Sequence, residues 1–154
     1  MRSAKVWVLA LLAVIAYVSC GPKAPEESVA QFDRRLETYV EILTLSLNQD
    51  TLQQCFYCPP GSTSYPITIA DEWISSLSQK PEIDVPGREV RFVSKEAADS
   101  AGLPAYFWVI DYMPVGHDAR IQLMDPIRQI LFGASYSRSG GKWKLVSVYL
   151  DEED

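Results

Sequence analysis

The chain has 154 residues, of which 47% are hydrophobic and 22% are charged, which is enough for one domain with its own core. It has 20 acidic against 14 basic residues and a formal net charge of −6 at pH 7. A surface of this sign repels phosphate backbones, and no cluster of Lys and Arg alternates with aromatic residues, so the composition argues against nucleic-acid binding.

The first twenty residues have the organisation of an export signal. Arg2 and Lys5 form a short basic front, and the apolar run Val6–Val18 is shorter than the ~20 residues needed to span a bilayer. The run closes on a small residue and a cysteine, and Val18-Ser19-Cys20 resembles the lipobox of bacterial lipoproteins.

This resemblance implies that residues 1–19 are a signal peptide and that Cys20 carries the fatty acid that anchors the protein to a membrane of the cell envelope. Gly21, rather than Asp, after the cysteine implies by the same resemblance the outer membrane, facing the periplasm, if the host is Gram-negative. Residues 20–28 contain two prolines and several charges, so we expect a flexible tether there.

The two remaining cysteines form a Cys55-x-x-Cys58 motif. With Cys20 acylated they are an even pair in a compartment that permits disulfides, so we expect a structural disulfide between them. The alternative is a thiol-disulfide redox protein in which the first cysteine is a reactive thiolate. A metal site is disfavoured because the motif supplies only two ligands and His117 is the sole histidine, and no cofactor is expected.

The first predicted element of the domain is an amphipathic helix over residues 29–47. Its apolar residues recur every three to four positions, which places them on one stripe. A short further helical turn is expected over Thr51–Tyr57. Thr68, with Asp71 three residues later, predicts the cap of a shorter helix that places Ile69, Trp73 and Leu77 at helical spacing.

From residue 88 onward the period changes to two, which predicts strands. The expected strands are Arg88–Lys95, Ala105–Met113, Ile130–Arg138 and Lys142–Leu150, with Arg120–Met124 as an additional short edge strand. Ser139-Gly140-Gly141 predicts a hairpin between the last two of the four. Ala105–Met113 is apolar on nearly both faces, so we expect a central strand covered on both sides. Residues 151–154 are expected to be an acidic tail.

Helices followed by a meander predict an α+β domain over residues 29–150, with a long N-terminal helix and shorter helices on a curved antiparallel sheet of about four strands. This order of elements is similar to the cone-shaped fold of the nuclear-transport-factor-like and cystatin-like superfamily. The resemblance implies a pocket between helix and sheet, and Trp108, Asp111 and Tyr112 are the candidate residues for it.

We therefore expect a membrane-anchored, non-enzymatic module that binds a small ligand or a protein partner, or a second copy of itself, through the sheet face. The alternative is a pocket enzyme of the same fold in which Asp111 is the acid or base, because this carboxyl group interrupts an apolar strand. His117 lies between two predicted strands and is expected to be an exposed loop residue.

Overall fold

The computed structural model describes residues 28–60 and 65–152. The predicted signal peptide, the acylated Cys20 and its tether up to residue 27 lie outside the described residues. The chain divides into two units at Arg34 and Arg35, and the whole sheet belongs to the second unit.

Helix α2, Val29–Leu47, begins with a capping box. The Gln31 backbone amide donates to Ser28 Oγ at 3.3 Å, and Gln31 Oε1 accepts from the Ser28 backbone amide at 3.1 Å. The buried residues of α2 all lie in its second half: Tyr39, Ile42, Leu43, Ser46 and Leu47. A short helical segment therefore packs on the sheet, not the long helix expected.

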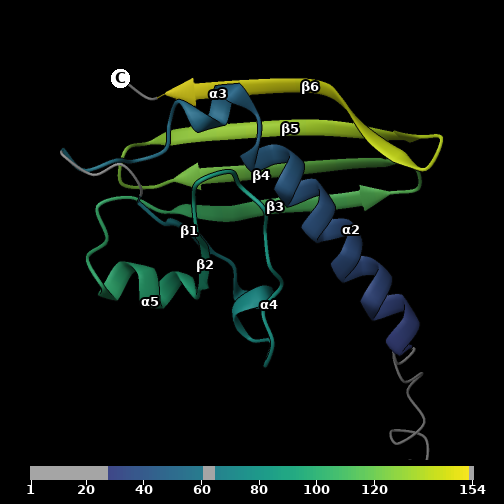
Figure 1. Ribbon diagram of the computed structural model, residues 1–154, viewed down its shortest axis with the longest axis horizontal. Helices are drawn as coiled ribbons and strands as arrows, with labels where there is room; N and C mark the ends of the chain where they lie inside the picture. Colours follow the sequence, from purple (N-terminus) through teal and green to yellow (C-terminus); the bar gives the residue numbers. More distant parts are fainter. Residues whose placement is uncertain (1–27, 61–64, 153–154) are drawn as a thin grey trace, which may run out of the picture. The chain divides into compact units, whose positions relative to one another are not determined.

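The fold is α+β, as predicted, with ten elements in the described part of the chain. After α2 come α3 (Asp50–Gln53), β1 (Ile67–Ala70), α4 (Glu72–Ser75), β2 (Val90–Val93), α5 (Lys95–Ser100), β3 (Phe107–Val115), β4 (Asp118–Asp125), β5 (Ile130–Ser139) and β6 (Lys142–Glu152). Figure 1 shows β3 to β6 side by side as the long strands of the sheet.

The sheet is mixed and open, with six strands in the order β2-β1-β3-β4-β5-β6, so the expectation of about four antiparallel strands was wrong. The difference comes from β1, which pairs in parallel with both β2 and β3. We expected Thr68 to cap a helix, but it lies inside β1. Asp71 is the cap instead, because its carboxylate accepts from the Ile74 amide at 2.9 Å at the start of α4.

The antiparallel part of the sheet matches the sequence more closely. Gly140 and Gly141 both have positive φ, 61° and 79°, and form the predicted hairpin turn between β5 and β6. Two details differ. Strand β4 lies between β3 and β5 and is not an edge strand. Strand β6 continues to Glu152, so Asp151 and Glu152 belong to the ladder and are not a tail.

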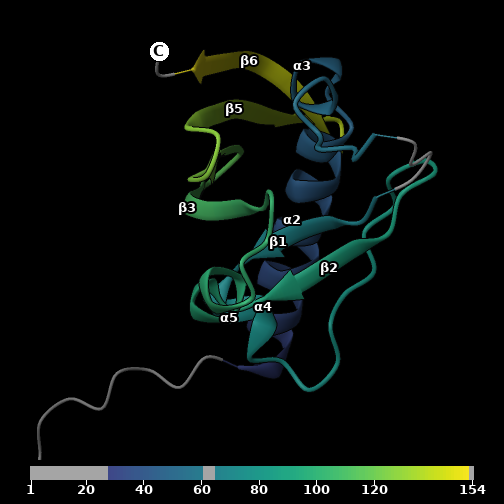
Figure 2. The same ribbon diagram turned by 90° about the vertical axis from the view of Figure 1, so that its left-hand side faces the viewer.

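The core lies between one face of β3–β6, which we call the inner face, and the helices α2 and α3. Its fully buried side chains come from both layers: Ile42, Leu43, Leu47, Leu52, Ile121, Leu123 and Phe132. Burying a side chain of this size stabilises the fold by about 1.5–3 kcal/mol. Figure 2 shows α2 and α3 on one side of these strands and α5 below β3.

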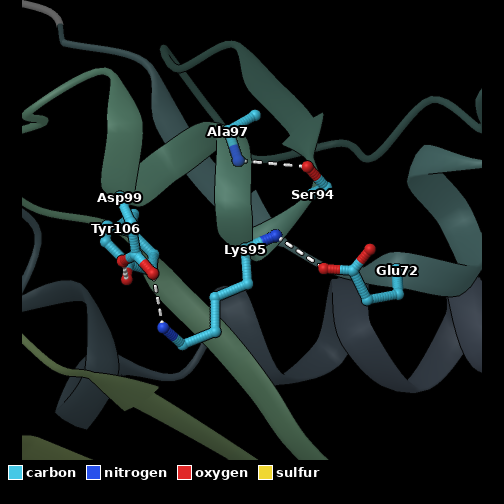
Figure 3. Close-up of polar contacts among 6 residues, drawn as sticks. All are labelled: Glu72, Ser94, Lys95, Ala97, Asp99 and Tyr106. Carbon is cyan, nitrogen blue, oxygen red and sulfur yellow. Dashed lines mark hydrogen bonds and ion pairs between the residues drawn. The ribbon is translucent and has the colours of Figure 1, made fainter.

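Helix α5 is held by the polar contacts drawn in Figure 3. Ser94 Oγ accepts from the Ala97 amide at 3.1 Å and caps the helix, while the Lys95 amide donates to Glu72 Oε1 at 2.8 Å. At its other end Asp99 accepts from Lys95 Nζ at 2.6 Å and from the Tyr106 hydroxyl. These contacts fix α5 against the start of β3.

Candidate binding face of the sheet

Strands β3 to β6 have a second face, opposite the core, which we call the outer face. The strand register places on it Trp108, Asp111, Met113 and Val115 of β3; Met124, Gln122, Arg120 and Asp118 of β4; Leu131, Gly133, Ser135 and Ser137 of β5; and Asp151, Tyr149, Ser147 and Lys144 of β6. Within the described part of the chain, α5 is the helix on this side, and it reaches only the end of β3 where Trp108 lies.

A bulge in β3 decides which residues reach the outer face. Val109 pairs with Leu123 and Asp111 pairs with Gln122, so Ile110 is the extra residue. We expected β3 to be covered on both faces. Instead Ile110 is 37% exposed and the second half of the strand is open, which corrects that expectation.

The outer face contains a shallow groove that crosses all four strands. Its volume is about 320 Å³, and its lining includes Met113, Val115, Arg120, Ser135 and Val146. The three apolar side chains are 49%, 62% and 67% exposed, respectively. Neighbouring apolar side chains this exposed are typical of an interaction surface.

A tyrosine laid across a glycine shapes the middle of this face. Tyr149 of β6 lies over Gly133 of β5, where an added Cβ would come within 2.2 Å of the tyrosine ring. The Tyr149 hydroxyl accepts from the Gln122 side-chain amide on β4. Because position 133 has no side chain, Tyr149 of the edge strand β6 can cross β5 and reach Gln122 on β4.

The three candidate pocket residues lie in different places. Asp111 lies on the outer face and accepts from Arg120 at 2.6 Å and 3.1 Å in a two-nitrogen ion pair, so it is not in an enclosed pocket. Trp108 lies at the covered end of the same face, with Lys95 Nζ 5.2 Å from its ring. Tyr112 points into the core, where its ring contacts Tyr39 edge to face at 4.9 Å.

A buried polar cluster between α2 and the sheet escaped the sequence analysis. The Tyr39 hydroxyl donates to the carboxylate of Asp71, and Trp73 packs edge to face on Tyr39 at 5.4 Å. Burial, and then the Asp71 charge, raise the pKa of Tyr39. Burial raises the pKa of Tyr112 to about 12, and its hydroxyl has no partner among the described residues. The Tyr39–Asp71 hydrogen bond holds α2 to the cap of α4, and both residues are buried, so we interpret the cluster as structural.

Cys55 and Cys58 are free thiols in the structure, in contrast to the disulfide expected between them. Cys55 is buried and donates to the Thr51 carbonyl at 3.6 Å, whereas Cys58 is exposed and accepts from Arg88 at 3.2 Å. Burial raises the pKa of the Cys55 thiol, which disfavours the thiolate that a redox site needs.

A small cavity at the end of the sheet away from the groove is lined in part by two arginines. It has a volume of about 10 Å³, room for about one water molecule, and Arg88 and Arg128 are among its lining residues. Asp125, fully buried, accepts from Arg128 Nε at 2.6 Å, and both Arg88 and Arg128 are held by their own contacts. The cavity is too small for an organic ligand.

Three further observations concern metal binding, His117 and membrane-spanning helices. Among residues 28–60 and 65–152 no three His, Cys, Asp or Glu side chains are placed to hold a metal ion. His117 is exposed in the β3–β4 turn, as predicted. None of the helices in those ranges is long and apolar enough to cross a membrane.

Comparisons with protein-family models, with curated proteins and with solved structures give no match to this chain.

Proposed function

We propose that the protein is a lipid-anchored, non-enzymatic module of the cell envelope that binds a protein partner through the outer face of β3–β6. The observation that carries the proposal is the groove with its exposed Met113, Val115 and Val146. These side chains lie outside the core, so the stability of the domain does not account for them, and an occupant would remove them from water.

The chemistry of the groove defines the partner. Its lining combines these apolar side chains with two charged groups, the guanidinium of Arg120, which is paired with Asp111, and the carboxylate of Asp118. A partner segment that combines apolar side chains with a hydrogen-bond acceptor suits this pattern. Because well-packed, desolvated contacts at the centre of an interface supply most of its binding free energy, we expect Met113 and Val115 to matter more than the polar rim.

The anchor is the second part of the proposal, and it rests on the lipobox-like end of the N-terminal segment. We expect Cys20 to take up a fatty-acid analogue and the protein to fractionate with membranes. Cys20→Ser should abolish labelling and leave unprocessed precursor. Release of unlabelled wild-type protein in soluble form would refute the anchor and leave the binding face untouched.

Site-specific photocrosslinking in cells tests the binding face. A photoreactive residue at position 113 should give a discrete adduct, whereas the same residue at position 127 is the matched control, since Met113 and Ile127 are both 49% exposed. Val115→Asp should reduce the position-113 adduct without changing the thermal melt. Equal adducts from both positions, or an adduct that survives Val115→Asp, would refute the proposal.

A further inference from the structure

Strand β6 ends the sheet, so along one side no described strand pairs with it. It has eleven residues, most of them exposed, and its exposed apolar side chains include Leu145, Val146 and Tyr149. The backbone groups along such an edge are a template for another strand. An edge of this length needs either a partner or a device that prevents pairing.

The charges of β6 are separated by sign. Lys142 and Lys144 lie at the start of the strand, and Asp151 and Glu152 lie at its end. A second copy of the same strand laid alongside in parallel would place like charges together. In the antiparallel direction each basic end meets an acidic end, so the edge is complementary to itself in that direction alone.

The bulge in β6 completes this complementarity. Ser135 pairs with Ser147 and Tyr136 with Leu145, so Val146 is the extra residue. Lys144 and Asp151 are an odd number of positions apart and would point to opposite faces of a regular strand. With the bulge between them they pair with Ser137 and Leu131, which lie on the same face of β5. Residues opposite each other across an antiparallel pair share a face, so the bulge allows these two charges to meet.

We infer that β6 pairs in antiparallel fashion with β6 of a second copy of this chain, with Lys144 of each copy opposite Asp151 of the other. Because Val146 is the extra residue in both copies, this register places Val148 opposite Val148 on the two-fold axis. Lys142 then lies diagonal to the same carboxylate, within reach of a long side chain. The interface is isologous, so each charge pair occurs twice.

Charged edges and bulges more often prevent strands from pairing. Charges that serve this purpose repel a second copy of the strand, and a protective bulge turns the strand away from it. In β6 the two signs occupy opposite ends, and the bulge brings Lys144 and Asp151 onto one face. Self-pairing therefore accounts for both features together.

This pairing goes beyond the proposed function and is independent of it. It uses the free backbone edge of β6, the strand that carries Val146 at one end of the groove, and leaves the part of the groove at Met113 and Val115 open. Two copies would present two binding grooves on one continuous sheet. The dimer can therefore fail its test while the binding face passes, and the reverse also holds.

Charge exchange tests the inference on the full chain in detergent micelles, with sedimentation velocity as the measurement. Wild-type protein should be dimeric. Lys144→Glu and Asp151→Lys should each weaken the dimer by at least about tenfold, because each creates two like-charge pairs. The double variant, and an equimolar mixture of the two single variants, should dimerise again. Lys80→Glu, an exposed residue elsewhere with the same charge change, is the control.

Crosslinking gives a second measurement that does not depend on affinity. In a Cys58→Ser background, Val148→Cys lies on the expected two-fold axis opposite its own copy and should form a covalent dimer on mild oxidation, whereas Ser139→Cys at the end of β5 should not. A monomeric wild type, a dimer that neither charge change weakens, or single variants whose mixture stays monomeric would overturn the inference.

Discussion

The inner face of β4 and β5 carries Ile121, Leu123 and Phe132, all fully buried, whereas the outer face of the same strands carries Arg120, Gln122 and Ser135. Alternate residues of one backbone thus serve two purposes. The inner residues exclude water and hold the helices, so changes there should unfold the protein. The outer residues contribute little to folding and are free to contact a partner. The following predictions test this division, from the largest expected effect to the smallest.

Phe132→Ala should cause the largest loss, about 3–5 kcal/mol in the free energy of unfolding, because it leaves a cavity in the core. Met113→Ala, on the outer face, should change stability by no more than about 0.5 kcal/mol. Urea unfolding of both variants measures the contrast. Similar losses for the two variants would mean that the faces are not divided in this way.

Tyr39→Phe should cost about 1.5–3 kcal/mol, because it removes the hydroxyl that donates to the buried carboxylate of Asp71. Tyr136→Phe is a matched control, since both tyrosines are 1% exposed and the Tyr136 hydroxyl bonds to a neutral group, the Ser46 hydroxyl, at 2.9 Å. Its cost should be about 0.5–1.5 kcal/mol. Chemical denaturation measures the free energy of unfolding of both variants. A smaller loss for Tyr39→Phe than for Tyr136→Phe would contradict the view that the bond to the Asp71 carboxylate is the stronger of the two.

Gly133→Ala should cost about 1 kcal/mol, because the new Cβ displaces the Tyr149 ring and breaks its bond to Gln122. The same change in a Tyr149→Ala background should be close to neutral. A thermodynamic cycle of the four proteins measures this coupling. Additive losses would mean that the glycine is needed for a reason other than the tyrosine.

Tyr112→Phe should have the smallest effect at neutral pH, between no change and a gain of about 1 kcal/mol, because the buried hydroxyl it removes has no described partner. Its effect should grow in alkali. The folded-state pKa is raised from 10.0 to about 12, so the contribution of the neutral phenol is complete below pH 10 and is lost as the pH rises through 12.

Unfolding titrations across that pH range, on wild type and Tyr112→Phe, follow the difference. The wild type should lose more stability than the variant as the pH rises. Parallel curves would mean that Tyr112 ionises in the folded protein as readily as in the unfolded one.

The sequence predicted the elements whose signals are local. The helix at residues 29–47 follows from its apolar stripe, and the β5–β6 hairpin follows from Gly140-Gly141. Strand β1 was missed because it has only four residues, and Ile69 also fits the helical spacing of Trp73 and Leu77. Its parallel pairing depends on distant segments, which local periodicity does not show.

The candidate site was less predictable, because β-bulges determine which side chains lie on the outer face. Asp111 was predicted as a pocket carboxylate because it is a charge in an apolar strand, but it lies on the outer face in an ion pair with Arg120. The bulge at Ile110 depends on the register with β4, which no single strand encodes. For the same reason Trp108 and Tyr112 lie on opposite faces, and the groove around Met113 was not foreseen.

The parallel pairing of β1 has a consequence for the order of folding. The hairpins β3–β4 and β5–β6 join neighbours in the chain, whereas β1 must find Val90 with Ile67 and Phe107 with Ile69. Closing these longer loops costs more chain entropy before any contact offsets it, so the meander should form early and β1 and β2 should dock late. The amides of β1 should then exchange with solvent deuterium sooner than those of β4, through partial openings that leave the meander intact.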